Sequence, residues 1–521
     1  MKGRVLDRQG EIIDSRERSR RLPSWLFNFL EQSGAPLNLA IFRIVIFLRI
    51  PFCRDFTGSL GSSFLPSEFR VAPYGWQPIL DWLPINPTVD GWACALLLVA
   101  CVTTAIGFHT RKSAIIASLL ATYVFLVPQL AGGFAHNDLA LLWFAYMLAA
   151  SPCGDVLSVD AAIKAWRTAD SSAPSPTRQS LRYGVPAKFI FVLLGIIYLF
   201  PGLCKLHALG LDWGSAHNMR QELWSHWVSE RVVSPLRVDQ SPLLCHILGL
   251  STLAFETSAI LLVLFPLGRA VLVVAGPLFH SGIWLLMGIQ FLSLQLCYVG
   301  LVDWQYLCQR LSVRFIKQPK VIEYDAADLP TRRRLSVLKA FDFFNAYRCV
   351  ERQKGTEDFR ERETVTISSA NSGATPTLLP AIVVGSVLIV GNIICGAGGI
   401  ATGYPMSCFP RFDKIPPSER REVVFEALDK KDHEIPIRLP DDNFDFGADR
   451  WRKLCSNVSK IKAGREVAIQ HLWKFVVLRH TPAGKVHTVR FIDERFSIDP
   501  ADAGENPVRS EVLYEFNPDQ K

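Results

Sequence analysis

Nine apolar segments, each close to the length needed to cross a lipid bilayer, constrain the fold of this chain more than any other feature. A spanning helix needs roughly 17–25 mainly apolar residues, and its backbone must form all its hydrogen bonds internally. The segments lie at about 37–55, 90–108, 113–130, 136–151, 186–205, 243–265, 269–287, 289–302 and 378–400. We therefore expect an all-α polytopic membrane bundle of about nine transmembrane helices.

The composition agrees with this fold class, because 49% of the 521 residues are hydrophobic. The net charge of +8 comes from basic residues that cluster between the apolar segments, which is typical of topology signals. The sequence carries no nucleic-acid motif, so the bilayer, and not a nucleic acid, is the expected partner.

The basic residues also predict an orientation. Seven Lys and Arg residues lie in the first 34 positions and thirteen lie between 305 and 377, whereas none lies between Leu130 and Asn137. Basic loops stay on the cytoplasmic side, so we expect the N-terminus inside and the C-terminal region outside, in a bacterial cytoplasmic (inner) membrane. The polar start has no small-residue cleavage site after an early apolar run, so no signal peptide is predicted.

Five domains follow from these patterns. We expect a cytoplasmic polar N-terminus (1–34), a membrane domain of eight spans (35–305), a basic cytoplasmic segment (306–377), a ninth transmembrane helix (378–401) and an extracytoplasmic α+β domain (402–521).

The last domain is predicted from short motifs. PSERREVVFEAL is expected to form a helix, and FVVLRHTPAGKVHTVRFI two strands around a Pro-Ala-Gly turn. Cys408 and Cys455 are a disulfide candidate if this domain lies outside the cell. The chain has no CxxC pair and no spacing typical of metal ligands, so no metal is predicted.

Lys205 is the most informative residue, because it follows the apolar run FIFVLLGIIYLF at the end of a predicted span. One interpretation is an anchor whose ammonium reaches the membrane surface along an apolar stem. The other is a desolvated amine with a lowered pKa, which would act as a base near neutral pH.

Other ionisable residues within the spans also have two interpretations. Glu256 could hold the bundle together by pairing with a cation such as Arg43. His280 could be a hydrogen-bonded core histidine or a proton shuttle. His136 and Asn137 could cap a helix or form the polar mouth of a cavity.

Four motifs in the membrane segment resemble the HTTM domain, which is the membrane domain shared by vitamin K-dependent gamma-carboxylase and many bacterial proteins. They are IFRIVIF, SPCGDVLSVDAAI, IYLFPGLCKLHALGLDW and FHSGIWLLMGIQF. Glu256, in the apolar segment at about 243–265, also matches the family. The resemblance covers about 35–305 and implies a helical membrane bundle.

The resemblance also implies a chemistry and a set of site residues. Lys205 is similar in position to the family's base, which deprotonates a reduced quinone (a vitamin K-like quinol) before O2 and CO2 react. His280 resembles a family histidine, and His136 or Asn137 falls near another. The implied supporting residues are Glu256, Arg43 and Trp213, the tryptophan that follows GLCKL in the third motif. The chain differs from the carboxylases at Cys204, where they have a second lysine, and in its shorter outer domain.

The segment VIEYDAADLPTRRRLSVLKAFDFF reads as strand, loop and helix, and it resembles the opening of the thioredoxin-like family. Asp328 and Thr331 occupy the positions of the two redox cysteines of that family.

Two functions are consistent with the sequence. The first is a membrane enzyme, carboxylase- or epoxidase-like and of the lyase class, that acts on a lipid-soluble quinol. The second is a non-catalytic membrane protein that binds a lipid or serves as a scaffold, with a protein substrate or partner at its C-terminal domain. A transporter is less favoured, because the sequence has no clear inverted repeat.

Overall fold

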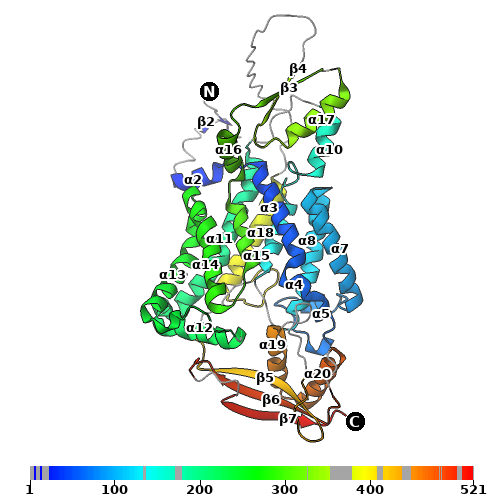
Figure 1. The fold of residues 1–521 in the computed structure, drawn as a ribbon, viewed down its shortest axis with the longest axis vertical. Coiled ribbons are helices and arrows are strands. Elements are labelled where there is room, and N and C mark those ends of the chain that lie inside the picture. The colour runs from blue at the N-terminus through cyan, green and yellow to red at the C-terminus, as the bar shows by residue number, and fades with distance from the viewer. Residues whose placement is uncertain are drawn as a thin grey trace, which may run out of the picture.

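The computed structural model describes residues 5–6, 12–13, 23–132, 137–169, 179–230, 232–325, 327–351, 378–407, 415–436, 448–479, 482, 484–501 and 507–519. It shows a mainly helical bundle with a small helix–strand unit at one end and an α+β domain at the other (Figure 1).

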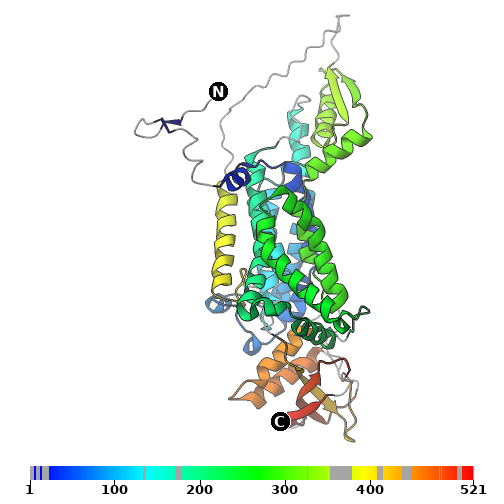
Figure 2. The same ribbon diagram turned by 90° about the vertical axis from the view of Figure 1, so that its left-hand side faces the viewer.

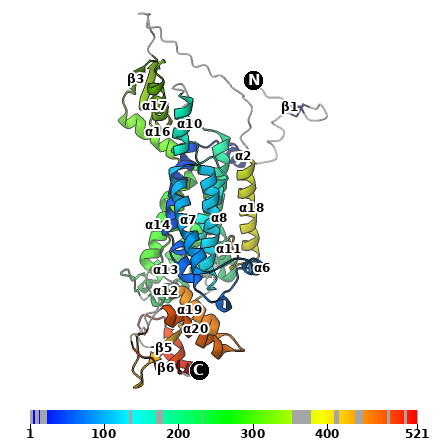
Figure 3. The same cartoon turned by 90° about the vertical axis from the view of Figure 1, so that its right-hand side faces the viewer.

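Seven helical segments in the described part of the chain are long and apolar enough to cross a membrane. They are α3 (Pro36–Arg49) with its continuation to Thr57, α7 (Pro87–Ile106), α8 (Thr110–Gln129), α11 (Leu181–Leu209), α13 (Pro242–Leu262), α14 (Pro266–Met287) and α18 (Leu379–Ala397). The protein is therefore an integral membrane protein. Helix α18 stands at one edge of the bundle (Figures 2 and 3).

The expectation of nine full-length spans is not confirmed. The predicted fourth and eighth spans correspond to α9 (Leu139–Ala149) and to α15 (Leu292–Cys297) with η5 (Tyr298–Leu301), which are short apolar helices. Ten of the eleven residues of α9 are buried, so this helix is apolar on every side because it packs inside the bundle. Hydrophobicity alone does not separate such a core helix from a lipid-facing span.

Helices α11 and α13 approach each other closely, and this contact positions the candidate site. A Cβ at Gly195 would lie 2.8 Å from the Cα of Ile260, and a Cβ at Gly202 would lie 3.0 Å from the Cβ of Glu256. Small residues allow such contacts between membrane helices. Gly202 therefore lets α11 pass directly beside Glu256.

One end of the bundle, where α3 begins, carries four helices and two strands. They are α2 (Ser24–Glu31), α10 (Val159–Thr168), α16 (Trp304–Phe315) and α17 (Leu329–Ala340), with strands β3 (Lys320–Tyr324) and β4 (Tyr347–Glu351). Strands β3 and β4 pair in parallel around α17. The sequence correctly predicts the strand, loop and helix here, and the parallel return strand completes a β–α–β unit. The two short strands β1 (Val5–Leu6) and β2 (Ile12–Ile13) also pair with each other.

Short helices surround the opposite end of the bundle: η1 (Ile50–Phe52), α4 (Arg54–Thr57), α5 (Ser59–Ser63), η2 (Ser67–Phe69), α6 (Gln77–Leu80), η3 (Gly210–Gly214), α12 (Ala216–Glu230) and η4 (Val238–Gln240). The C-terminal domain follows with β5 (Glu419–Leu428), α19 (Ala448–Ser459), α20 (Arg465–Arg479), β6 (Thr488–Ser497) and β7 (Arg509–Phe516). Its three strands form an antiparallel sheet in the order β5-β6-β7.

The C-terminal domain is α+β as predicted, but two of its elements were predicted wrongly. PSERREVVFEAL contains strand β5, in which Val423, Phe425 and Ala427 are buried at alternate positions. FVVLR belongs to helix α20, in which Ile469, Leu472 and Val476 lie on one buried face. Buried residues that recur at every second position indicate a strand, and buried residues that recur at every third or fourth position indicate a helix.

The C-terminal domain is attached to the membrane bundle by a buried polar contact. Arg450 of α19 lies 2.5 Å from Asp55 of α4, and Gln129 donates to the other oxygen of Asp55 at 3.0 Å. Apolar residues of both parts share one core, which includes Leu65 and Phe69 together with Trp451. The domain is therefore packed onto the bundle.

Candidate functional site

Lys205 lies about one turn before the C-terminal end of α11, and its side chain points into the bundle. The residue is 1% exposed. Its Nζ donates to both carboxylate oxygens of Glu256 on α13, at 2.7 and 2.6 Å. The ammonium therefore does not extend to the membrane surface, and the two residues form a buried ion pair.

Trp213 lies next to this ion pair. The Nζ of Lys205 lies 5.0 Å from the centre of the Trp213 ring, a distance at which a cation is attracted to an indole face. Trp213 lies in η3, and Asn218 of α12 donates to its backbone carbonyl at 2.7 Å, which fixes the backbone that carries the ring. The structure thus brings Lys205, Glu256 and Trp213 together.

Arg43 does not pair with Glu256, so that expectation is wrong. Its guanidinium is buried and donates to the backbone carbonyls of Cys153 at 2.7 Å, Leu157 at 2.6 Å and Ala105 at 3.3 Å. These carbonyls belong to the loop before α10 and to the last turn of α7. Arg43 therefore fixes that loop, which is a structural role.

Ser158 and Asp160, from the motif SPCGDVLSVDAAI, lie in the same region and also have a structural role. Ser158 caps α10 by accepting a hydrogen bond from the amide of Ala161 at 2.9 Å. Asp160 accepts from the amides of His109 and Thr110 at 2.9 and 2.7 Å. Burial favours a higher pKa for Asp160, but the hydrogen bonds from Thr110 and His109 outweigh it and hold the pKa below its usual value.

His280 on α14 belongs to a chain of three hydrogen-bonding side chains. Its Nε2 lies 2.7 Å from the hydroxyl of Tyr198 on α11, and Tyr298 on η5 donates to Tyr198 at 2.7 Å. The Nδ1 atom of His280 is buried and has no hydrogen-bond partner in the described residues. When Tyr198 accepts from Tyr298 and donates to Nε2, the neutral ring carries its proton on Nδ1. This N–H can then donate to another oxygen.

The ion pair and the hydroxyl chain lie in one aromatic region. Tyr198 and Lys205 are two helical turns apart on α11 and so project from the same face. Phe255, which precedes Glu256, has its ring centre 5.2 Å from that of Tyr198 and stacks on Phe279 at 4.4 Å. The Phe291 ring lies 5.1 Å from that of His280.

The other predicted site residues lie elsewhere or cannot be placed. Asn137 donates to the backbone carbonyl of Gln290 at 3.5 Å, in the loop that carries Phe291. Helix α9 begins after Asp138, whose side chain does not cap it. His136 lies outside the described residues.

The proposed disulfide stays a prediction. Cys455 is buried in the core of the C-terminal domain, but Cys408 lies outside the described residues. Within the described ranges, no cluster of three or more His, Cys, Asp or Glu side chains could hold a metal ion.

Sequence reasoning missed Tyr198 and Tyr298. A tyrosine in an apolar segment is neutral and common in membrane helices, so neither residue drew attention beside the charged ones. The seven-residue spacing between Tyr198 and Lys205 was the available signal, because it places both side chains on one face of a helix.

A helical membrane bundle with buried polar residues at the α11–α13 contact defines the class of this protein. A family model described as the HTTM domain matches residues 32–302, which is more than half of the chain. The chain therefore belongs to the HTTM domain family, as the resemblance predicted. No curated protein and no solved structure matches it.

Proposed function

We propose that this protein is a membrane enzyme in which Lys205 removes a proton from a hydroxyl group of a lipid-soluble quinol. The observation that supports this proposal most is the Lys205–Glu256 pair, which is buried inside an apolar bundle. Charged groups in such surroundings are costly, and they commonly mark functional sites.

The pair can hold one proton in two ways. In the ionic form the proton is on the amine, and in the neutral form it is on the carboxylate of Glu256. A low dielectric disfavours separated charges, so the neutral form becomes accessible. The lone pair of the Lys205 amine then accepts the hydroxyl proton, so that the O–H bond breaks and an N–H bond forms.

The hydroxyl chain supports a positioning role for His280. Its Nδ1–H lacks a partner in the described residues, so it is available to donate to an oxygen of a bound ring. The rings of Phe255, Phe279 and Phe291 surround this position with apolar surface, which fits a flat aromatic molecule.

The family resemblance extends the proposal to a vitamin K-like reduced quinone, with O2 and CO2 as further reactants in a carboxylase- or epoxidase-like reaction. Lys205, His280 and the aromatic residues around them are the groups that would contact the quinol. A protein substrate or partner would bind at the C-terminal domain.

A second candidate function is that of a non-catalytic lipid-binding or scaffold protein. One observation favours it: both oxygens of Glu256 already accept hydrogen bonds from Lys205. On this second interpretation, the only role of the pair is to hold α11 against α13.

An activity assay with a matched control separates the two functions. The purified protein is given reduced menaquinone or vitamin K hydroquinone under air, and quinol loss and epoxide formation are followed. Lys205→Ala should lower the rate by about 10²–10⁴-fold, the usual contribution of a positioned base.

Lys188→Ala is the control, because Lys188 is also a buried lysine of α11 but donates to the backbone carbonyl of Leu30. This variant should keep most of the activity. If wild type and Lys205→Ala both match the rate without protein for every quinol tested, the enzyme proposal is refuted.

We further propose that the end carrying α17 is cytoplasmic and that the C-terminal domain lies outside, in a bacterial inner membrane. The basic residues at the α17 end support this orientation. A membrane-impermeant maleimide applied to intact cells should label a cysteine placed at Asp429 but not one placed at Lys317. The reverse labelling would invert the orientation.

A further inference from the structure

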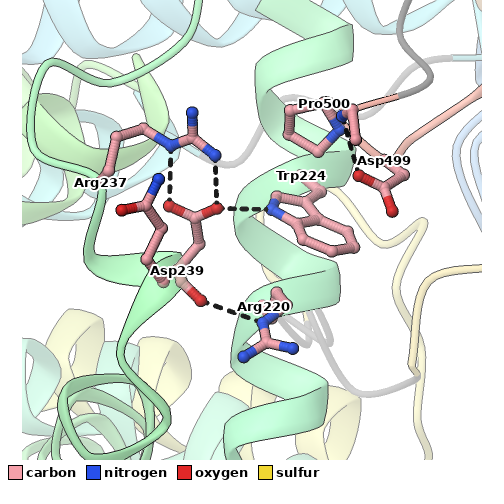
Figure 4. A pocket seen from close by; sticks show the side chains of 8 residues that line it. Arg220, Trp224, Arg237, Asp239, Asp499 and Pro500 are labelled. Atoms are coloured by element: carbon pink, nitrogen blue, oxygen red, sulfur yellow. Dashed lines mark hydrogen bonds and ion pairs between the residues drawn. The ribbon is translucent and has the colours of Figure 1, made fainter.

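A polar cavity lies between α12, η4 and the loop at 499–501, separate from the Lys205 site. Its volume is about 390 Å³. Figure 4 shows Arg220, Trp224, Arg237 and Asp239 on one part of the wall, with Asp499 and Pro500 approaching from the C-terminal domain.

Part of the wall is a fixed framework. Arg237 donates to both oxygens of Asp239 at 2.9 Å, and the indole nitrogen of Trp224 donates to the same carboxylate at 3.0 Å. The hydrogen bonds from Arg237 hold the pKa of Asp239 below its usual value. Arg237 and Asp239 therefore neutralise each other's charge.

Two other charged groups still have unused hydrogen-bonding capacity. Arg220 uses its Nε to donate to the backbone carbonyl of Asp239 at 3.0 Å, and its guanidinium lies 5.7 Å from the centre of the Trp224 ring. Its two terminal nitrogens make no hydrogen bond to the described residues. Asp499 accepts from the amide of Ala501 through Oδ1 at 2.9 Å, and its Oδ2 has no partner within the same ranges. The cavity thus offers one cation and one anion to a ligand.

The neighbouring residues place this cavity at the depth of lipid headgroups. The segment that connects α12 to α13 exposes Val233 (52%) and Leu236 (50%), and the first turn of α13 exposes Leu243 (67%). Helix α13 is a membrane-spanning candidate that begins at Pro242, directly after η4. Apolar side chains exposed at the start of a span contact lipid, so the polar wall beside them lies where hydrocarbon gives way to water.

From these observations we propose that the cavity binds the headgroup of a bilayer phospholipid that carries a phosphate and a primary ammonium, as in phosphatidylethanolamine. The terminal nitrogens of Arg220 would donate to the phosphate oxygens, the geometry in which arginine recognises phosphate best. Asp499 would accept from the ammonium group, and the Trp224 indole would contact the methylene groups between them. This site does not depend on the activity proposed for Lys205.

Lipid binding to the intact protein tests the proposal. The full chain in detergent is titrated with phosphatidylethanolamine, phosphatidylglycerol or phosphatidylcholine, and bound lipid is counted by native mass spectrometry. Phosphatidylethanolamine should bind most tightly. Arg220→Gln should weaken its binding by about tenfold or more, as expected when a hydrogen bond between charged groups is lost.

Asp499→Asn keeps the shape of the loop and removes its negative charge. This variant should still bind phospholipid but should lose the preference for phosphatidylethanolamine over phosphatidylglycerol. Arg509→Gln, an exposed arginine on β7 of the same domain, should change nothing. If Arg220→Gln does not fold, the loss of preference in Asp499→Asn still decides the question.

Three results would overturn the proposal. In the first, both variants bind all three lipids as the wild type does. In the second, inorganic phosphate or soluble phosphoethanolamine displaces the lipid at equal concentration, so that the ligand is a free phosphate compound. In the third, an acidic peptide displaces it in the same way, so that the cavity is a peptide site.

Discussion

Among the residues that the structure describes, two buried ion pairs join segments that are distant in sequence, and they differ in how their carboxylates are satisfied. Asp55 accepts from Arg450 through one oxygen and from Gln129 through the other. Glu256 accepts from Lys205 through both oxygens. Two donors from different elements, Arg450 and Gln129, thus hold Asp55, whereas a single amine donates to both oxygens of Glu256. The first pair is therefore a structural connection, and we propose that the second exchanges a proton with a substrate.

The surroundings of the two pairs reinforce this difference. The backbone amide of Asp55 donates to Asp138 at 3.2 Å, and Asp138 also accepts from Ser293, which in turn accepts from Arg49 at 3.1 Å. The Arg450–Asp55 pair is thus one part of a polar network that joins the C-terminal domain to α15. The Lys205–Glu256 pair lies instead beside the ring of Trp213.

Removing Arg450 should have the largest effect on stability. Arg450→Ala leaves Asp55 buried without its cation, which typically costs about 3–5 kcal/mol. Thermal unfolding in detergent and limited proteolysis would measure this loss, and the C-terminal domain should become sensitive to protease first. Arg495→Ala removes an exposed pair with Glu419 and should cost less than about 1 kcal/mol. Equal losses in the two variants would refute the structural role of Arg450.

The next largest effect on stability should come from separating Lys205 and Glu256. Lys205→Met alone leaves a buried carboxylate unpaired and should cost about 3 kcal/mol or more. Lys205→Met combined with Glu256→Leu should regain most of this stability, because an apolar pair of similar size fits an apolar site. A double variant less stable than Lys205→Met would show that the pair itself stabilises the bundle.

A smaller effect is expected at the hydroxyl chain. Tyr298→Phe removes the donor to Tyr198 and should cost about 1 kcal/mol of stability. It should also slow quinol turnover, because Tyr298 no longer fixes the direction in which Tyr198 donates to His280, and with it the proton on Nδ1. Tyr306→Phe, an exposed tyrosine of α16, is the control. An unchanged rate in Tyr298→Phe would remove the chain from the proposed mechanism.

The smallest effect concerns pH and Asp160. Its pKa is lower in the folded protein than its usual value of 3.8, so its ionised form stabilises the fold above that value. This contribution should decline as the pH falls below about 3.8 toward the folded pKa. Wild type should therefore be more stable than Asp160→Ala at pH 7, by about 1 kcal/mol, and the difference should shrink with acid. A difference independent of pH would contradict this account.

The sequence predicted the bundle because long apolar segments have few other folds available to them. It left open whether the short fourth segment would be tilted or partly buried, since Leu139–Ala149 is apolar on all sides whether it faces lipid or protein. It identified Lys205 and Glu256 as residues that need partners, but spacing along the chain does not reveal that Gly202 brings α13 beside Lys205. Arg43 was assigned to the wrong partner because backbone carbonyls, which carry no sequence signal, satisfy it.

Quinol turnover by the folded double variant, Lys205→Met with Glu256→Leu, tests the central claim most directly. We predict that the variant unfolds at nearly the temperature of the wild type and yet oxidises no quinol above the rate without protein. A variant that is equally stable and turns over quinol at the wild-type rate would show that the amine of Lys205 is not the base.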